Sequence, residues 1–211
     1  MPIRCIAVVL SVFVFGCASD HSTIQPLERD PRKPESPVVT SSQAAKFPSP
    51  ARIASYNKGV EAHRVQDYRA AREHWLSAAK AGSAAALNNL GYLFFTGKGG
   101  DPDPHRGIAF WKEAAARGFP ESQLNLGKVF ETGKFVPQDL VEAYAWYRCA
   151  AEGAKVSTQT SSEQELQRQV GRAANEAISK MLGKLSTDQF ISAEQRANRY
   201  IRSYALRNIE T

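Results

Sequence analysis

Cysteine is scarce in this chain, with 3 residues among 211. Cys5 and Cys17 lie close to the N-terminus, so Cys149 stands alone in the remainder. A single cysteine cannot form an intramolecular disulfide, and the fold must therefore be stabilised by its core and its hydrogen bonds.

Sequence motifs for catalysis, metals and nucleic acids are also missing. The chain contains no Gly-x-Ser-x-Gly, no phosphate-binding glycine loop ending in Lys-Ser or Lys-Thr, and no His-Glu-x-x-His. The histidines show no spacing typical of a metal site: His21, His63, His74 and His105. The formal net charge is +6, but no block of lysine and arginine is dense enough to indicate nucleic-acid binding. We therefore expect no enzyme, no cofactor and no metal centre.

Long apolar runs are absent as well. The run from Ile6 to Phe15 has ten apolar or small residues, well short of the ~20 that span a bilayer as a helix. With Arg4 before it and Gly16-Cys17 after it, this run is typical of a signal peptide. A secretory signal with an incidental cysteine and a lipoprotein signal both remain open on this ground.

The segment Val14-Phe15-Gly16-Cys17 resembles a bacterial lipobox. This resemblance implies that residues 1–16 are a lipoprotein signal peptide, cut before Cys17, and that Cys17 carries lipid such as palmitate. Ala18 resembles the pattern that allows export to the outer membrane. The resemblance thus predicts a protein held by lipid in the bacterial cell envelope, at the outer membrane and facing the periplasm.

Residues 17–50 have a different composition from the rest. Six prolines alternate with polar residues and no apolar periodicity is present: Pro26, Pro31, Pro34, Pro37, Pro48 and Pro50. Such a composition predicts a disordered tether. At ~3.1 Å per residue it reaches on the order of 100 Å when extended, which holds a folded domain away from the membrane.

One pattern occurs twice between Ala86 and Gly153, with a step of 36 residues. Leu90-Gly91 recurs as Leu126-Gly127, Phe94 as Phe130, Gly97 as Gly133, Asp103 as Asp139, Trp111 as Tyr147, and Ala114-Ala115 as Ala150-Ala151. A weaker third copy lies upstream in Asp67, Ala71, Trp75 and Ala78-Ala79. A fixed period of this size predicts a solenoid of helical hairpins.

Each half of the repeat predicts one helix. In the first half Ala86, Leu90 and Phe94 form one apolar stripe, and Gly97 ends the helix. The second half begins at Asp103, an N-cap followed by a first-turn proline. Its stripe consists of small and aromatic residues: Gly107, Trp111, Ala114 and Ala115. Small residues at these positions let the two helices approach closely.

These residues resemble the Sel1-like repeat, a relative of the tetratricopeptide repeat. The matching positions are Ala86, Leu90-Gly91, Gly97, Gly99, Asp103, Phe110-Trp111, Ala114-Ala115 and Gly118, with departures at Ser122 and Phe135 in the next copy. The resemblance implies an all-α, right-handed α-solenoid of helix-turn-helix repeats over residues 51–154. It also implies a non-catalytic scaffold for protein–protein interaction.

Residues 155–211 are predicted to form a C-terminal helical cap. A capping box at Ser162-Glu163-Gln164-Glu165 starts one helix, and Ser186 with Gln189 starts a last one. Their apolar stripes include Leu166, Val170, Ala174, Ile178 and Met181, then Phe190, Ala193, Ala197, Ile201 and Tyr204. A pair of helices with one polar face closes a solenoid that otherwise exposes its last apolar side.

Several conspicuous side chains have a structural interpretation. The aligned acids Asp67, Asp103 and Asp139 are expected to cap helices rather than to form a carboxylate site. Aromatics at a constant repeat offset are expected in the core: Trp75, Trp111, Trp146 and Tyr147. Trp146 and Tyr147 point in different directions, so a half-buried position for one of them stays open. Cys149 is expected to be a buried apolar side chain rather than a reactive thiol.

Candidate partner-binding residues lie on the first helix of each repeat. Asn57, Asn89 and Asn125 each stand two residues before a glycine. A row of amides there would grip the backbone of a peptide, as related tetratricopeptide grooves do, or would join neighbouring repeats by hydrogen bonds; both interpretations stay open. Residues expected to share this surface are Asn88, Tyr92 and Lys128.

The sequence thus favours a scaffold that holds a protein or peptide partner at the envelope. The alternative is a binder of cell-wall glycan or exported polysaccharide, suggested by the mild positive charge and by Trp146-Tyr147. The identity of the partner lies in the surface positions that the repeat pattern leaves free.

Overall fold

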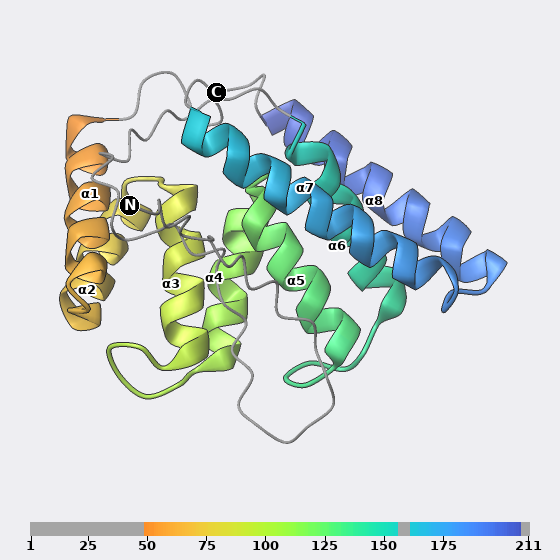
Figure 1. Cartoon of the computed structure of the whole chain (residues 1–211), viewed down its shortest axis with the longest axis horizontal. Helices are drawn as coiled ribbons and strands as arrows, with labels where there is room; N and C mark the ends of the chain where they lie inside the picture. The colour runs from red at the N-terminus through yellow and green to blue at the C-terminus, as the bar shows by residue number, and fades with distance from the viewer. Residues whose placement is uncertain (1–48, 156–160, 208–211) are drawn as a thin grey trace, which may run out of the picture.

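The computed structural model describes residues 49–155 and 161–207, and in these ranges it is entirely helical. The helices in chain order are α1 (Pro50–Arg64), α2 (Tyr68–Lys80), α3 (Ala84–Thr96), α4 (Pro104–Ala116), α5 (Pro120–Thr132), α6 (Leu140–Gly153), α7 (Ser161–Leu182) and α8 (Thr187–Arg207) (Figure 1). The predicted all-α class is confirmed.

The first six helices form three antiparallel hairpins. Helix α1 packs on α2, α3 on α4, and α5 on α6, and the hairpins are joined through contacts of α2 with α3 and of α4 with α5. Figure 1 shows them following one another along the long axis of the molecule. This arrangement confirms the predicted solenoid of helical hairpins.

The ends of these helices follow the predicted capping residues. Asp67, Asp103 and Asp139 each accept a hydrogen bond from the backbone N–H three residues later, at 3.0, 3.0 and 2.8 Å. Gly97 and Gly133 end α3 and α5 in the left-handed region, with φ of 77° and 67°. The three acids therefore act as helix caps.

Within each hairpin a glycine of the first helix lies against an aromatic ring of the second. A Cβ added to the glycine would lie 2.4, 2.3 and 2.5 Å from the nearest ring atom in the pairs Gly59–Trp75, Gly91–Trp111 and Gly127–Tyr147. No side chain larger than hydrogen fits at these distances. The glycine–aromatic contact therefore recurs in all three hairpins, with a step of 36 residues from the second to the third and a first hairpin that is four residues shorter.

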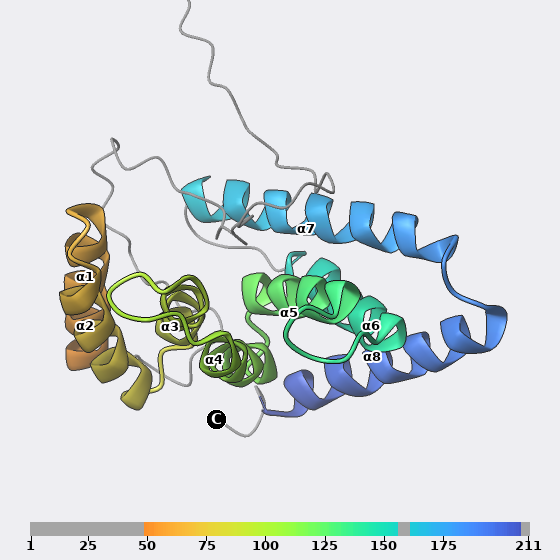
Figure 2. The same cartoon turned by 90° about the horizontal axis from the view of Figure 1, so that it is seen from below.

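The two C-terminal helices differ from the predicted pair. Both pack on α6, and they make scarcely any contact with each other. Figure 2 shows α7 and α8 diverging from the turn that connects them, on opposite sides of α5 and α6. Fully buried residues lie on both helices: Val170, Ala174 and Met181 on α7, and Ala193 and Ala197 on α8. The apolar sides of α6 are thus covered separately.

Polar contacts fix α8 to α6. Arg196 donates to Glu142 at 2.8 Å, and the hydroxyl of Tyr200 donates to the same carboxylate at 2.9 Å. The hydroxyl of Tyr144 donates to Glu194 at 2.6 Å. The start of α8 carries the predicted capping box, in which Ser186 N–H donates to the Gln189 side chain at 3.0 Å and Gln189 N–H to the Ser186 side chain at 3.3 Å.

Two predicted boundaries shift slightly. Helix α1 begins at Pro50, capped by Ser49, so the predicted tether of residues 17–50 extends at most to residue 49. Helix α7 begins at Ser161, one residue before the predicted capping serine. The predicted signal peptide, Cys17 and most of the tether lie outside the described residues.

Candidate partner-binding site

The predicted site lies on α1, α3 and α5, the first helices of the three hairpins; we call it the odd-helix surface. Its members are Asn57, Asn88, Asn89, Tyr92, Asn125 and Lys128. Asn88, Tyr92 and Asn125 are only 6, 3 and 5% exposed. The other members are half-buried. The accessible part of this surface is therefore narrower than the sequence alone indicates.

Asn88 joins two repeats. Its side-chain oxygen accepts a hydrogen bond from the hydroxyl of Ser122 on α5 at 2.9 Å, and its amide group donates to Asn89 at 3.4 Å. Its backbone carbonyl accepts from Nε1 of Trp111 at 3.1 Å. Asn88 therefore connects α3 to both α5 and α4, and it belongs to the packing between repeats.

The other asparagines of this surface form fewer hydrogen bonds than Asn88. The side-chain oxygen of Asn57 is buried and has no hydrogen-bond partner. Asn89 accepts from Asn88 and is half-buried, which leaves part of its amide at the surface. Asn125 lies one helical turn before Lys128 on α5, on the same side of that helix. Only Asn88 and Asn89 are joined directly by their amides.

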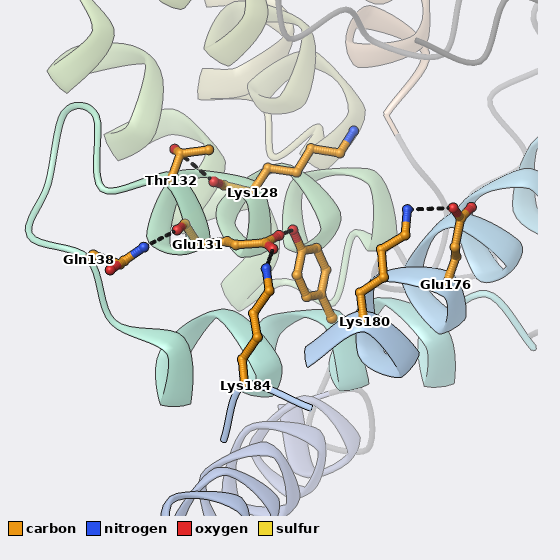
Figure 3. A network of polar contacts seen from close by, with 8 residues as sticks. Lys128, Glu131, Thr132, Gln138, Glu176, Lys180 and Lys184 are labelled. Atoms are coloured by element: carbon orange, nitrogen blue, oxygen red, sulfur yellow. Dashed lines mark hydrogen bonds and ion pairs between the residues drawn. The ribbon is translucent and has the colours of Figure 1, made fainter. Parts of the chain in front are cut away.

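Lys128 has an environment unlike that of the other lysines nearby. Burial lowers the pKa of its ammonium group, and no carboxylate of the described residues forms an ion pair with it. Lys180 and Lys184 on and after α7 are paired, with Glu176 at 2.6 Å and Glu131 at 3.0 Å. Figure 3 shows both of these pairs, and no ion pair is drawn to the ammonium group of Lys128 on α5.

Glu131 explains why Lys128 has no partner on its own helix. The Glu131 carboxylate accepts from the hydroxyl of Tyr147 at 2.8 Å and from Lys184 at 3.0 Å, while Gln138 donates to its backbone carbonyl at 2.8 Å. Burial and this carboxylate raise the pKa of Tyr147. The contacts join α5, α6 and the end of α7. Sequence reasoning missed them, because residues 131, 147 and 184 share no local pattern.

The aromatic rings suggested for sugar binding, those of Trp146 and Tyr147, are buried. Trp146 and Tyr147 are 8 and 1% exposed, so neither of them is half-buried. The ring of Tyr200 from α8 stacks on Trp146, with ring centres 4.6 Å apart. Cys149 is 2% exposed, and burial raises the pKa of its thiol to about 12. This confirms the structural interpretation of Cys149.

Two further classes of site were sought in the described ranges. Among residues 49–155 and 161–207, no three side chains of His, Cys, Asp or Glu lie close enough to hold a metal ion. Over the same ranges, none of the helices combines the length and the apolar character needed to cross a membrane.

Comparison with known proteins gives three matches in succession to the Sel1 repeat, at residues 52–83, 84–119 and 120–154. The chain is similar to the crystal structure of c5321, a protective antigen of uropathogenic Escherichia coli strains with an SLR fold. The identity is 25% and the TM-score 0.61, over 74% of this chain and 31% of that one.

A second similar structure is a Sel1 repeat protein from Oxalobacter formigenes, 25% identical with a TM-score of 0.47, over 72% of this chain and 60% of that one. The chain thus spans about a third of the first protein and somewhat over half of the second. No curated protein matches the chain.

Proposed function

Because residues 52–154 are three Sel1 repeats, we propose that this protein is a non-catalytic scaffold whose odd-helix surface holds an acidic segment of a partner protein at the bacterial envelope. Sel1 repeats generally act as scaffolds for protein–protein interaction. The finer parts of the proposal, namely the acidic group and the envelope, rest on Lys128 and on the N-terminal sequence.

The observation that carries the proposal is the ammonium group of Lys128, which forms no ion pair with a carboxylate of residues 49–155 or 161–207. A desolvated cation without a partner is costly, and the lowered pKa of Lys128 reflects that cost. A carboxylate from a partner would relieve it through a charge-assisted hydrogen bond. The neighbouring carboxylate Glu131 is already shared between Tyr147 and Lys184, so it does not compete for Lys128.

A side-chain amide on the preceding odd helix suits an extended partner segment. Asn89 retains a half-buried amide on α3, whereas the side-chain oxygen of Asn57 on α1 is buried and is not offered to a partner. Backbone N–H and C=O groups of an extended peptide pair with side-chain amides of this kind. The carboxylate then fixes the register of the segment, since it has one favourable position along the surface.

The proposed location at the envelope rests on Cys17 and the residues around it. A lipid on this cysteine would anchor the protein, and the proline-rich segment after it would let the repeats reach partners near the membrane. Replacing Cys17 by serine is expected to release the protein into the soluble fraction or to stall its processing. An unchanged membrane fraction for Cys17→Ser would show that something other than lipid anchors the protein.

Site-specific photocrosslinking in cells tests the partner surface. A photoreactive amino acid is placed at Asn89 on the odd-helix surface or at Glu113, an exposed position on α4. We expect a discrete protein adduct from position 89 and none from position 113. Mass spectrometry of the adduct distinguishes a protein from a glycan, and a glycan adduct would contradict the proposal.

Charge reversal then tests the role of Lys128. Lys128→Glu is expected to abolish the adduct from position 89, because it replaces the attractive charge with a repulsive one. The matched control is Lys112→Glu, which makes the same charge change at an exposed position on α4. If both variants retain the adduct, the partner does not bind through Lys128.

A further inference from the structure

The ring of Phe94 on α3 is covered by two guanidinium groups. The Cζ atoms of Arg72 on α2 and Arg106 on α4 lie 4.0 and 4.2 Å from the centre of this ring. A guanidinium group over an aromatic face is attracted by the ring and shields it from water. Phe94 is accordingly only 5% exposed. In this hairpin the chain's own arginines therefore close the aromatic ring.

The equivalent ring in the next hairpin belongs to Phe130, 36 residues later. The same step takes Asp103 to Asp139 and Arg106 to Glu142. The backbone is alike in both places, because Asp103 accepts from the N–H of Arg106 at 3.0 Å and Asp139 from the N–H of Glu142 at 2.8 Å. The side chains differ, since the carboxylate of Glu142 forms an ion pair with α8. It does not replace the guanidinium of Arg106.

The remaining cover on Phe130 is incomplete. Ile108 stands at the repeat position of Arg72, and it is 3% exposed in the core. A cation also lies over the ring of Phe130, but farther away: Nζ of Lys112 is 5.8 Å from the ring centre, close to the ~6 Å limit of a cation–π contact. Phe130 is half-buried where Phe94 is buried. Part of its ring is therefore left uncovered.

A cleft of about 580 Å³ opens beside this ring. Its walls are Phe130, the end of the α5–α6 loop, the first residues of α6 and Gln189 on α8. Pro137, Leu140 and Val141 make its apolar part. The volume lies within the range of ligand pockets, about 300–1,000 Å³. The cleft is thus large enough for one long side chain and the backbone on either side of it.

The polar atoms of the cleft are suited to a cation. Of the seven residues that line it in the described part of the chain, Asp139 alone is charged. The side chain of Asp139 is 43% exposed; it contacts Arg196 at 3.3 Å, but the closer partner of Arg196 is Glu142, at 2.8 Å. The amide group of Gln138 donates to the backbone of Glu131 at 2.8 Å, which leaves the side-chain oxygen of this exposed residue as an acceptor (Figure 3).

We propose that the cleft between Phe130 and Asp139 binds an arginine side chain of a partner protein. The guanidinium group stacks on Phe130, as Arg106 does on Phe94, and donates to the oxygens of Asp139 and Gln138. Its plane and its five donors match an aromatic face flanked by such oxygens better than an ammonium group does. The cleft shares no residue with the odd-helix surface, so it stands independently of the acidic segment proposed above.

Ligand-observed nuclear magnetic resonance of the full chain in a non-ionic detergent tests the site. The probes are Nα-acetyl-arginine methylamide, its citrulline counterpart, which has the same shape without the charge, and its lysine counterpart. We expect the Kd of the arginine probe to be about tenfold below that of the citrulline probe and about threefold below that of the lysine probe. Equal affinity for arginine and citrulline, or for arginine and lysine, would overturn the assignment to a guanidinium group.

Two variants locate the binding. Asp139→Asn keeps an N-cap of equal strength and is expected to raise the Kd of the arginine probe about fivefold. Phe130→Leu keeps an apolar side chain and is expected to raise it about threefold. The matched control is Asp103→Asn, the same change at the equivalent cap, and it is expected to leave the Kd unchanged. Equal effects of Asp103→Asn and Asp139→Asn would refute the site, as would unchanged binding in both cleft variants or no binding to the wild type.

A second copy of this chain is the competing occupant, because the chain carries exposed arginines of its own. Sedimentation equilibrium of the wild type and of Asp139→Asn distinguishes the two. Self-association that Asp139→Asn abolishes would assign the cleft to a second copy and overturn the separate partner. A monomeric wild type leaves the cleft free for a different protein and supports the proposal.

Discussion

Replacing Gly91 by alanine tests the glycine–aromatic contact on which the repeat depends. The added Cβ would lie 2.3 Å from Cδ1 and 2.4 Å from Nε1 of Trp111, whereas ordinary contacts begin at 3.4 Å. The indole must therefore move by about an ångström. Trp111 is fully buried, and its Nε1 donates to the carbonyl of Asn88 at 3.1 Å. A shift of the ring thus loses packing and strains this bond.

The expected cost follows from three effects. Overpacking in a filled core costs about 1–3 kcal/mol, and leaving the indole N–H unsatisfied costs about 1–3 kcal/mol more. The higher helix propensity of alanine offsets about 1 kcal/mol of this loss in stability. We expect Gly91→Ala to lower the free energy of unfolding by about 3 kcal/mol, measured by urea unfolding followed by far-ultraviolet circular dichroism.

Gly171→Ala is the matched control, because it makes the same change in the interior of α7. Its Cβ would lie 3.3 Å from the Cβ of Ala154, slightly inside ordinary contact, so a small shift relieves the contact and the cost is expected to be far smaller than at Gly91. If Gly91→Ala is as stable as Gly171→Ala, the contact between glycine and indole does not constrain the repeat and the explanation of its period is wrong.

Three further outcomes follow from the described contacts. Glu131→Ala removes the hydrogen-bond acceptor of Tyr147 and is expected to lower the free energy of unfolding by about 1.5–3 kcal/mol, measured in urea. The control Glu176→Ala breaks an exposed ion pair and is expected to lower it by under about 1 kcal/mol. Equal losses of stability in the two variants would contradict the role of Glu131. Burial and carboxylates raise the pKa of Tyr147, and that of Tyr200 to about 12. The folded protein then keeps protons that the unfolded chain releases near pH 10, so stability is full below pH 10 and falls as the pH rises toward 12, more for the buried Tyr147 than for Tyr200, which solvent screens. A flat profile of urea midpoints would show that these hydroxyls are solvated. Burial raises the pKa of Cys149 to about 12. Its alkylation by iodoacetamide is therefore expected to be slow in the native protein and fast in urea, as measured by mass spectrometry of the peptide that contains Cys149. Rapid alkylation of the native protein would show that the thiol is exposed.

The features predicted correctly are those that short stretches of sequence contain. The N-caps at Asp103 and Asp139 depend on the chain within three residues of each, and the glycine ends at Gly97 and Gly133 depend on the backbone conformation of one residue. The contact between Gly91 and Trp111 joins two helices and was not predicted. The period indicated that small residues let the helices approach closely, and the structure showed which side chains make the contact.

The burial of Trp146 depends on a residue from a distant part of the chain. The sequence placed it beside Tyr147 on one helix and left open whether one of the two side chains is half-exposed. Tyr200, 54 residues later by number, stacks on its ring because α8 returns along α6. The direction in which α8 leaves the turn after α7 depends on which apolar side of α6 is still uncovered, and no local pattern encodes that.

The candidate site likewise has features that the sequence determined and features that only the tertiary structure determined. The sequence alone determined the repeats, their caps, and the positions of Asn89, Asn125 and Lys128 on the first helices, because each depends on spacing within one period. Only the tertiary structure decided that Glu131 pairs with Lys184 and that Lys128 has no carboxylate partner within the described part of the chain. The pairing of charges depends on which helix lies beside which, and that is settled by packing over the whole chain.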